Sequence, residues 1–313
     1  MKAKYDWFYQ QCPFGDPLLR LLRHVPTSLL VGTAGAGRRE MLLDGKRCRA
    51  GVLVDLAVAQ DHRSLGPALM LQQGLAASGN EQLDLLYGFP NPKAAAVFKR
   101  MGYVRLGEIT RYARVLRHGS YLRTNLPAWA SVAVGALMDR FCKWSDLARQ
   151  RSLPRVACAW RDTADPRMDT LWRSSRKGVG LLGVRDQQRA AWRLDRAPFA
   201  GIRYLLLTTP GTDTLLAWFA LRVEGSALHV ADYWCDGAFE DIPKAYVLVL
   251  LDAARRGPYR SVSVEVAGCE GALRGWLGCG FKGRESRPVF GRWSKASPES
   301  APAVFLTAAD EDE

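Results

Sequence analysis

The segment 62–71, "HRSLGPALML", is the part of the chain whose residue types point most directly to a ligand. It follows the apolar run 51–59, "GVLVDLAVA", which predicts a strand covered on both faces. Gly66 and Pro67 then open a predicted helix, whose N-terminal N–H groups and dipole attract anions. Gly66 lets a phosphate approach the backbone, and Arg63 adds a permanent positive charge. The segment therefore predicts either a phosphate-binding loop or a plain strand–turn–helix connection, and its residues taken alone favour the plain connection.

Length and composition limit the classes of protein to consider. A chain of 313 residues, 48% of them apolar, predicts a globular protein of two domains. No apolar run approaches the roughly 18–20 residues that span a bilayer, and "MKAKYDWFYQQ" lacks the apolar core of an export signal. The seven cysteines form no C-x-x-C pair, and the four histidines show no ligand spacing. We therefore expect reduced thiols, a cytoplasmic location and no metal.

The formal net charge of +13 indicates anionic partners. Nucleotide-bearing cofactors, nucleic acid and anionic membrane all fit such a charge. An arginine-rich composition with solvated faces is an equal alternative, since net charge alone does not identify a partner.

Two stretches of the chain repeat in the same order. "WFYQQCPFGDP" begins at Trp7 and "WRLDRAPFAGI" at Trp192, an offset of 185 residues. "FKRMGYVRLGE" around Gly102 matches "WLGCGFKGRES" around Gly280, an offset of 178 residues. Because both matches occur in the same order at nearly equal offsets, we interpret the chain as an ancient duplication.

Each half then shows a similar order of predicted strands and helices, and Asp44–Gly45 in the first half predicts a turn between two strands. The layout predicts an α+β fold of two domains, each a mixed, mostly antiparallel central sheet flanked by helices. We expect the first domain over residues 1–117, a helical linker over 118–165 and the second domain over 166–293. Residues 294–313 are small, polar and acidic, which predicts a disordered tail.

Two motifs in the first half carry a resemblance to a known family. "R-x-x-G-x-A" at Arg63–Ala68 precedes a predicted helix and strand, and "N-x-x-A-x-x-x-F-x-x-x-G-Y" follows at Asn91–Tyr103. This order resembles the Gcn5-related N-acetyltransferase (GNAT) superfamily over residues 1–116. In that superfamily the first motif cradles the coenzyme A pyrophosphate, and the second lies beside the pantetheine arm. The resemblance implies a tandem GNAT arrangement with acetyl-CoA, or another acyl-CoA, as cofactor.

The resemblance also implies roles for individual residues. Asp55 stands where family members often place an acid that relays the substrate's proton. Phe98 stands where many members carry the tyrosine that protonates the leaving thiolate. Either water or another group, with Tyr87 and Tyr103 as candidates, reprotonates the sulfur here, or this copy is weakly active; we take Asp55 and Tyr87 as the catalytic residues. The residues implied to bind the cofactor are Leu56, Ala57, Val58, His62, Arg63, Ser64, Leu65, Gly66, Ala68, Asn91 and Phe98.

The second half lacks the first of these motifs. At the matching helix start it reads "DGAFEDIPKAYVLVLL", with no arginine and no paired glycine, and its three acids would repel a pyrophosphate. We therefore expect a degenerate second copy and one cofactor site, in the first half.

The function implied is an acyl-CoA-dependent acyltransferase, in particular an acetyl-CoA N-acetyltransferase. Direct transfer would go to an amine or hydroxyl of a small molecule or a carbohydrate precursor. Two alternatives stay open: an aminoacyl-tRNA-dependent transferase that builds peptidoglycan bridges, and a non-catalytic scaffold or nucleic-acid-binding protein with the same fold. The oligomeric state is not predicted.

Overall fold

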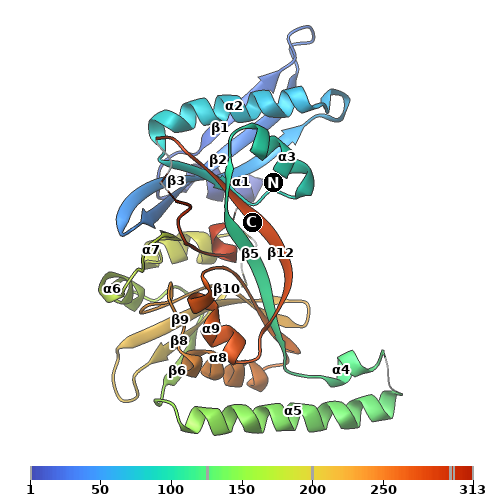
Figure 1. The fold of residues 1–313 in the computed structure, drawn as a ribbon, viewed down its shortest axis with the longest axis vertical. Helices are drawn as coiled ribbons and strands as arrows, with labels where there is room; N and C mark the ends of the chain where they lie inside the picture. The colour runs from blue at the N-terminus through green and yellow to red at the C-terminus, as the bar shows by residue number, and fades with distance from the viewer. Residues whose placement is uncertain (1, 125–126, 199–200, 296–297, 299, 312–313) are drawn as a thin grey trace.

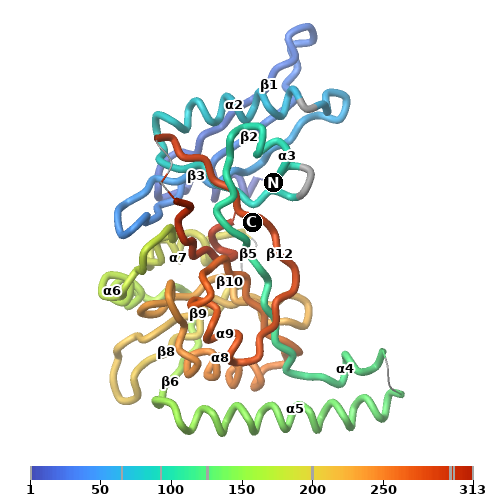
Figure 2. Tube along the Cα trace, viewed as in Figure 1, coloured from blue at the N-terminus to red at the C-terminus, as the bar shows by residue number. Residues whose placement is uncertain are grey.

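The computed structural model describes residues 2–124, 127–198, 201–295, 298 and 300–311. The side chains of Leu65, Pro92 and Lys93 also lie outside the described part. Figures 1 and 2 show the first half of the chain at one end of the molecule and the second half at the other, joined by two long strands along the middle.

The first half builds a sheet covered by two helices. The turn at Asp44 and Gly45, where φ is 51° and 75°, closes a long hairpin and confirms the turn expected at this pair. In chain order the elements are α1 (Lys2–Tyr5), η1 (Asp6–Gln10), β1 (Leu18–Arg23), β2 (Leu30–Leu43), β3 (Lys46–Val58), η2 (Gln60–His62), α2 (Leu65–Gln82), β4 (Leu85–Gly88), α3 (Pro92–Arg100) and β5 (Val104–Val115).

The second half repeats this order after a helical connection. The connection contains α4 (Gly119–Leu122) and α5 (Ala128–Arg151), and β6 (Ala157–Arg161) already pairs with β8 of the second half. The elements that follow are α6 (Arg167–Ser174), β7 (Leu181–Gly183), α7 (Gln187–Ala190), η3 (Ala191–Asp195), β8 (Arg203–Thr208), β9 (Leu215–Glu224), β10 (Ala227–Cys235), α8 (Lys244–Arg256), β11 (Ser261–Ala267), α9 (Glu270–Gly278) and β12 (Lys282–Trp293).

The two halves exchange their last strands. In the order of pairing, β12 lies between β4 and β5, and β5 lies between β12 and β11. The end of β12 thus completes the sheet of the first half, at Phe290–Trp293 against β4, while Thr110–Val115 of β5 pair with β11 of the second half. Because each half needs a strand from the other, the halves form one continuous sheet.

The internal repeat is visible at matching positions. Helices α3 and α9 begin 178 residues apart, as do strands β5 and β12. The π-helical turns η1 and η3 place Trp7 and Trp192 face to face, with ring centroids 5.4 Å apart. Each indole N–H donates to the other tryptophan's carbonyl oxygen, at 2.7 and 3.2 Å. This reciprocal contact is what a two-fold relation between duplicated halves requires.

The C-terminal segment corrects the expected disorder of residues 294–313. Val304–Thr307 form strand β13 and Ala308–Asp310 form η4, and both are buried. Strand β13 pairs with β7 on one side and with β11 on the other, which links β2 of the first half back to the second half. The prediction was wrong for residues 304–310 because their order depends on distant partners, whereas residues 296–297, 299 and 312–313 lie outside the described residues.

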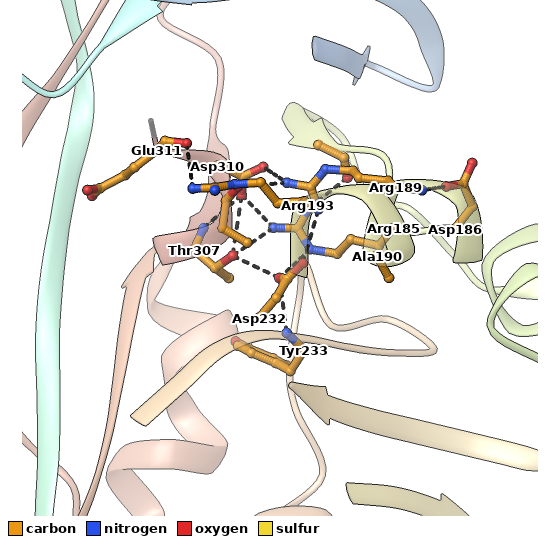
Figure 3. A network of polar contacts seen from close by, with 12 residues as sticks. Arg185, Asp186, Arg189, Ala190, Arg193, Asp232, Tyr233, Thr307, Asp310 and Glu311 are labelled. Atoms are coloured by element: carbon orange, nitrogen blue, oxygen red, sulfur yellow. Dashed lines mark hydrogen bonds and ion pairs between the residues drawn. The ribbon is translucent and has the colours of Figure 1, made fainter. Parts of the chain in front are cut away.

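A network of buried charges holds this segment in place (Figure 3). Asp232 on β10 and Asp310 in η4 each bind both Arg185 and Arg189, at distances from 2.6 to 3.0 Å. The Thr307 hydroxyl donates to Asp232 at 2.8 Å. The two carboxylates therefore compensate the two guanidinium groups in a region from which water is excluded.

Candidate functional site

The candidate site lies where two neighbouring parallel strands separate. Strand β4 pairs with β3 over Leu85–Tyr87 against Ala50–Val52, and β4 ends at Gly88. Strand β3 continues to Val58, paired only with β2 on its other side among the described residues. The backbone of β3 beyond Val52 therefore faces a gap in the sheet and has polar groups available to a ligand.

A bulge distorts β3 inside this gap. Thr33 pairs with Ala57 and Gly35 with Val54, so Asp55 and Leu56 together face a single residue of β2. Asp55 adopts a φ of 51°, in the left-handed region that side chains rarely occupy. Such bulges re-aim side chains and backbone groups next to binding sites. The sequence run 51–59 gave no sign of the bulge, since its residues are ordinary strand formers.

The N-terminus of α2 offers fewer donors than the sequence suggested. Ser64 is the N-cap, and its side chain caps no helical N–H. The backbone N–H groups of His62, Arg63 and Ser64 already donate to carbonyl oxygens of the turn, at 2.8 to 3.1 Å. Pro67 has no N–H, and the N–H of Ala68 falls within the regular helical ladder. Of the backbone N–H groups at the start of α2, those of Leu65 and Gly66 therefore remain available to an anion.

The space around these two donors is open. A Cβ built on Gly66 would meet only the Ser64 hydroxyl oxygen, at 4.0 Å. The Arg63 Nε–H donates to the Val58 carbonyl at 3.0 Å, which leaves its terminal nitrogens exposed beside the helix start. The His62 ring lies 4.6 Å from that of His24. An anionic group approaching Gly66 would thus meet two N–H groups and a cation.

Asn91 and Phe98 lie on the side of the gap formed by β4 and α3. The Asn91 side-chain oxygen accepts the Ala94 N–H at 2.9 Å and so caps α3, which leaves its amide nitrogen as the group for a ligand. Phe98 is only 5% exposed and packs against Tyr103, with ring centroids 4.9 Å apart. Its ring lies 3.2 Å from where a Cβ of Gly88 would be. Phe98 therefore shapes the end of β4 from the core.

The structure excludes Tyr87 as a surface proton donor. Its side chain is fully buried among the aromatic residues around Trp192, and its hydroxyl donates to the Asp310 carbonyl at 2.8 Å. Burial raises the pKa of Tyr87 above its ordinary value. The prediction was wrong because alternate residues of β4 face opposite sides of the sheet, and Tyr87 faces the side away from α2 and α3. Burial likewise raises the pKa of Tyr103, whose buried hydroxyl has no hydrogen-bond partner in the described part of the chain.

Asp55, by contrast, lies in an open pocket of about 430 Å³. The Tyr9 hydroxyl donates to its carboxylate at 2.5 Å, and the Lys4 ammonium lies 3.6 Å away. Tyr5 stacks on Tyr9 with ring centroids 5.3 Å apart. The remaining lining residues are Leu19, Thr33, Leu56 and Ala57. The pocket thus reaches the backbone of the bulge, where the carboxylate and the gap in the sheet meet.

Sequence reasoning missed Lys4, Tyr5 and Tyr9. They precede Asp55 by more than forty residues, and no spacing relates them to it. The one available signal was the repeat that begins at Trp7, since it showed that the N-terminal segment belongs to the folded unit.

The corresponding gap in the second half is filled. Strand β10 pairs with β11 only over Ala227–Val230, and β11 pairs with β13 at Val266 and Ala267. Phe305 of β13 contacts the rings of two β10 residues and of Phe239, with centroids 5.6 to 6.1 Å apart. The C-terminal segment therefore occupies the place where a ligand could enter.

The comparisons with known proteins address the fold. No protein-family model matches the chain, and neither does any curated protein. A conserved protein of unknown function from Enterococcus faecalis V583, "Probable N-Acyltransferase", matches with a TM-score of 0.58 at 12% identity, over 86% of this chain and 60% of that one. A GCN5-related N-acetyltransferase from Anabaena variabilis matches with a TM-score of 0.62 at 12% identity, over 94% of this chain and 66% of that one.

A third structure has the same two-copy architecture. Saccharomyces cerevisiae N-myristoyltransferase, solved with bound myristoyl-CoA, matches with a TM-score of 0.56 at 13% identity, over 95% of this chain and 71% of that one. This chain spans less than two thirds of the length of the first two structures. Together with the internal repeat and the exchanged strands, these matches show that the chain has the GNAT fold in tandem.

Proposed function

We propose that the protein is an acyl-CoA-dependent acyltransferase with one cofactor site, in the first half. The observation that carries the proposal is the bulged, one-sided end of β3 beside the uncapped N-terminus of α2. Unpaired backbone next to a free helix N-terminus suits a ligand with an extended amide arm and an anionic end. Bound acyl-CoA would supply the thioester that donates the acyl group.

The first half has residues suited to each part of such a cofactor. The N–H groups of Leu65 and Gly66, with the Arg63 side chain, would bind the pyrophosphate. The backbone of Leu56–Val58 would pair with the pantetheine arm and hold an N–H toward the thioester oxygen. Asn91 would donate its free amide N–H to the arm.

Asp55 would act on the acceptor. In our proposal it takes the proton as the acceptor's nitrogen or oxygen bonds to the acyl carbon and the carbon–sulfur bond breaks. The Tyr9 hydroxyl, already donating to Asp55, would orient the carboxylate toward the 430 Å³ pocket that admits the acceptor. The leaving thiolate would take its proton from solvent, because Tyr87 and Tyr103 are buried. We propose acetyl as the acyl group and an amine as the acceptor group.

The test uses thermal unfolding with acetyl-CoA, coenzyme A and tRNA. We expect stabilisation by the coenzyme A compounds in the wild type and a weaker stabilisation in Gly66→Ala, whose Cβ fits the protein but enters the space through which a phosphate approaches the backbone. Gly66→Glu should lose the stabilisation, since a carboxylate would repel the pyrophosphate. The absence of any response to a coenzyme A thioester contradicts the proposal, and stabilisation by tRNA alone supports the aminoacyl-tRNA alternative. Thiol release from acetyl-CoA across a panel of amines and alcohols would then identify the acceptor.

A further inference from the structure

Helix α5 exposes large apolar side chains that an ordinary surface helix would bury. Trp129, Leu137, Phe141 and Trp144 are 69–79% exposed, although helices normally bury such residues. With 3.6 residues per turn, these four side chains project within an arc of about 120° and form one face. Val134 and Leu147, both at least 40% exposed, extend that face.

The opposite side of α5 holds the helix to the protein through small and polar residues. Asp146 is 3% exposed and pairs with Arg114 at 2.7 Å and with Arg255 at 2.5 Å. Asp139 binds His118 at 2.6 Å, and Gly135 packs directly against the Gly119 backbone. The apolar face is therefore turned outward by specific inward contacts.

The charges exposed along α5 are all positive. Arg140, Lys143, Arg149 and Arg151 are exposed, and Arg140, Lys143 and Arg151 have no ion-pair partner in the described part of the chain. Both acids of α5, Asp139 and Asp146, are engaged on the inward side. Figure 1 shows α5 along one end of the molecule, where with α4 it extends beyond the sheet.

We propose that α5 is a membrane-surface helix that lies in the plane of an anionic phospholipid bilayer. An exposed face of tryptophan, phenylalanine and leucine beside lysine and arginine is the pattern of helices that insert one side at the headgroup level. Anionic headgroups complement the basic residues, and tryptophan rings are favoured at this depth. No helix in the described residues is long and apolar enough to cross a membrane.

A second copy of the chain is a poorer occupant for this face. It would bring the same four basic residues and no exposed acid from α5, in a protein whose net charge is +13. Like charges facing each other across an interface oppose association. Charge complementarity therefore favours the lipid surface.

The test is sedimentation of the protein with vesicles, which needs neither cofactor nor acceptor. We expect binding to mixed phosphatidylcholine–phosphatidylglycerol vesicles, weakened by salt, and little binding to phosphatidylcholine alone. Phe141→Glu with Trp144→Glu should lower the partition by roughly 100-fold, since two aromatic side chains no longer insert. Arg140→Glu with Lys143→Glu should lower it roughly 10-fold or more.

Matched controls introduce glutamate at exposed apolar and basic residues outside α5. Val179→Glu changes a residue that is 77% exposed, and Lys46→Glu with Lys99→Glu reverses two charges in the first half. Both controls should bind as the wild type does. Quenching of tryptophan fluorescence by brominated lipid should fall in Trp129→Phe with Trp144→Phe. The absence of vesicle binding overturns the proposal, as does binding unaffected by the α5 changes. A dimer in analytical ultracentrifugation that Phe141→Glu with Trp144→Glu dissociates, without vesicle binding, would assign the face to a second copy.

Discussion

Strands β3 and β4 of the first half separate after Val52 and leave the end of β3 unpaired on that side in the described part of the chain, whereas β10 and β11 of the second half separate around the segment 304–310. Both β3 and β10 carry a bulge near the point of separation, at Asp55–Leu56 and at Ala231. The arrangement of strands and bulges is thus the same in both halves, and the halves differ in what fills the gap between the separating strands. One gap has polar groups available to a ligand, and the other is closed by the chain itself.

This difference shows that two copies of one fold can fill the same gap differently. In the second half, the buried groups of Asp232, Asp310, Arg185 and Arg189 pair with one another and hold segment 304–310 against β10. Burial alone would raise the pKa of Asp310, but attraction by Arg185 and Arg189 outweighs it, so the pKa lies below its ordinary value.

The largest expected effect is on turnover, from a substitution of Asp55 in the open gap of the first half. Asp55→Asn removes the proposed proton acceptor but keeps a side chain that tolerates the left-handed backbone, so the fold should not change. We expect turnover to fall by about 10²–10⁴-fold, the usual contribution of a general base. Steady-state kinetics measures the fall, and stabilisation by acetyl-CoA should persist. Unchanged turnover would remove Asp55 from the mechanism.

A substitution in the filled gap of the second half should lower the free energy of unfolding. Phe305→Ala empties a site bounded by Tyr233, Trp234 and Phe239, where the phenyl ring is fully buried. We expect a loss of about 3–5 kcal/mol in the free energy of unfolding, from lost burial and the cavity left behind. Urea denaturation measures this loss. A loss below about 1 kcal/mol would mean that segment 304–310 does not close the gap in solution.

Acid should destabilise the fold through the buried His229 of the second half. His229 is 1% exposed, and burial lowers its pKa to about 4, although Glu224 attracts the charged form. Its pKa in the unfolded chain is about 6.5, so between these values the unfolded state binds more protons and stability falls as the pH is lowered. The loss should reach about 3 kcal/mol near pH 4.

The variant His229→Asn isolates this contribution. Its amide can still bond the Ser263 hydroxyl, which lies 3.0 Å from the histidine ring nitrogen. Unfolding by urea, measured from pH 7 to pH 4, should therefore lose most of its pH dependence. If the variant kept the slope of the wild type, the acid sensitivity would belong to other groups.

Sequence reasoning recovered what local patterns and chain order encode. The turn at Asp44–Gly45, the repeats at Trp7 and Trp192, and the order of strands and helices all follow from neighbouring residues, and the structure confirms the tandem fold they predicted. The closing segment was missed because "AVFLTAADEDE" reads as a small, acidic tail, while its order comes from arginines more than a hundred residues away. The Tyr9–Asp55 contact and the face to which Tyr87 points are likewise set by sheet pairing.

The smallest effect should come from the acids Asp236 and Glu240 in the loop that precedes α8. Arg176 lies 3.3 Å from Asp236 and 3.7 Å from Glu240, in pairs that are more than half exposed. Arg176→Ala should cost less than about 1 kcal/mol, because solvent screens such pairs. In a Gly66→Glu background it should create no stabilisation by acetyl-CoA, since segment 304–310 still fills the gap beyond these acids. Adding Asp236→Asn and Glu240→Gln removes the repulsive carboxylates as well. If coenzyme A then bound in a Gly66→Glu background, the acids and not the closing segment would be what keeps the second half empty.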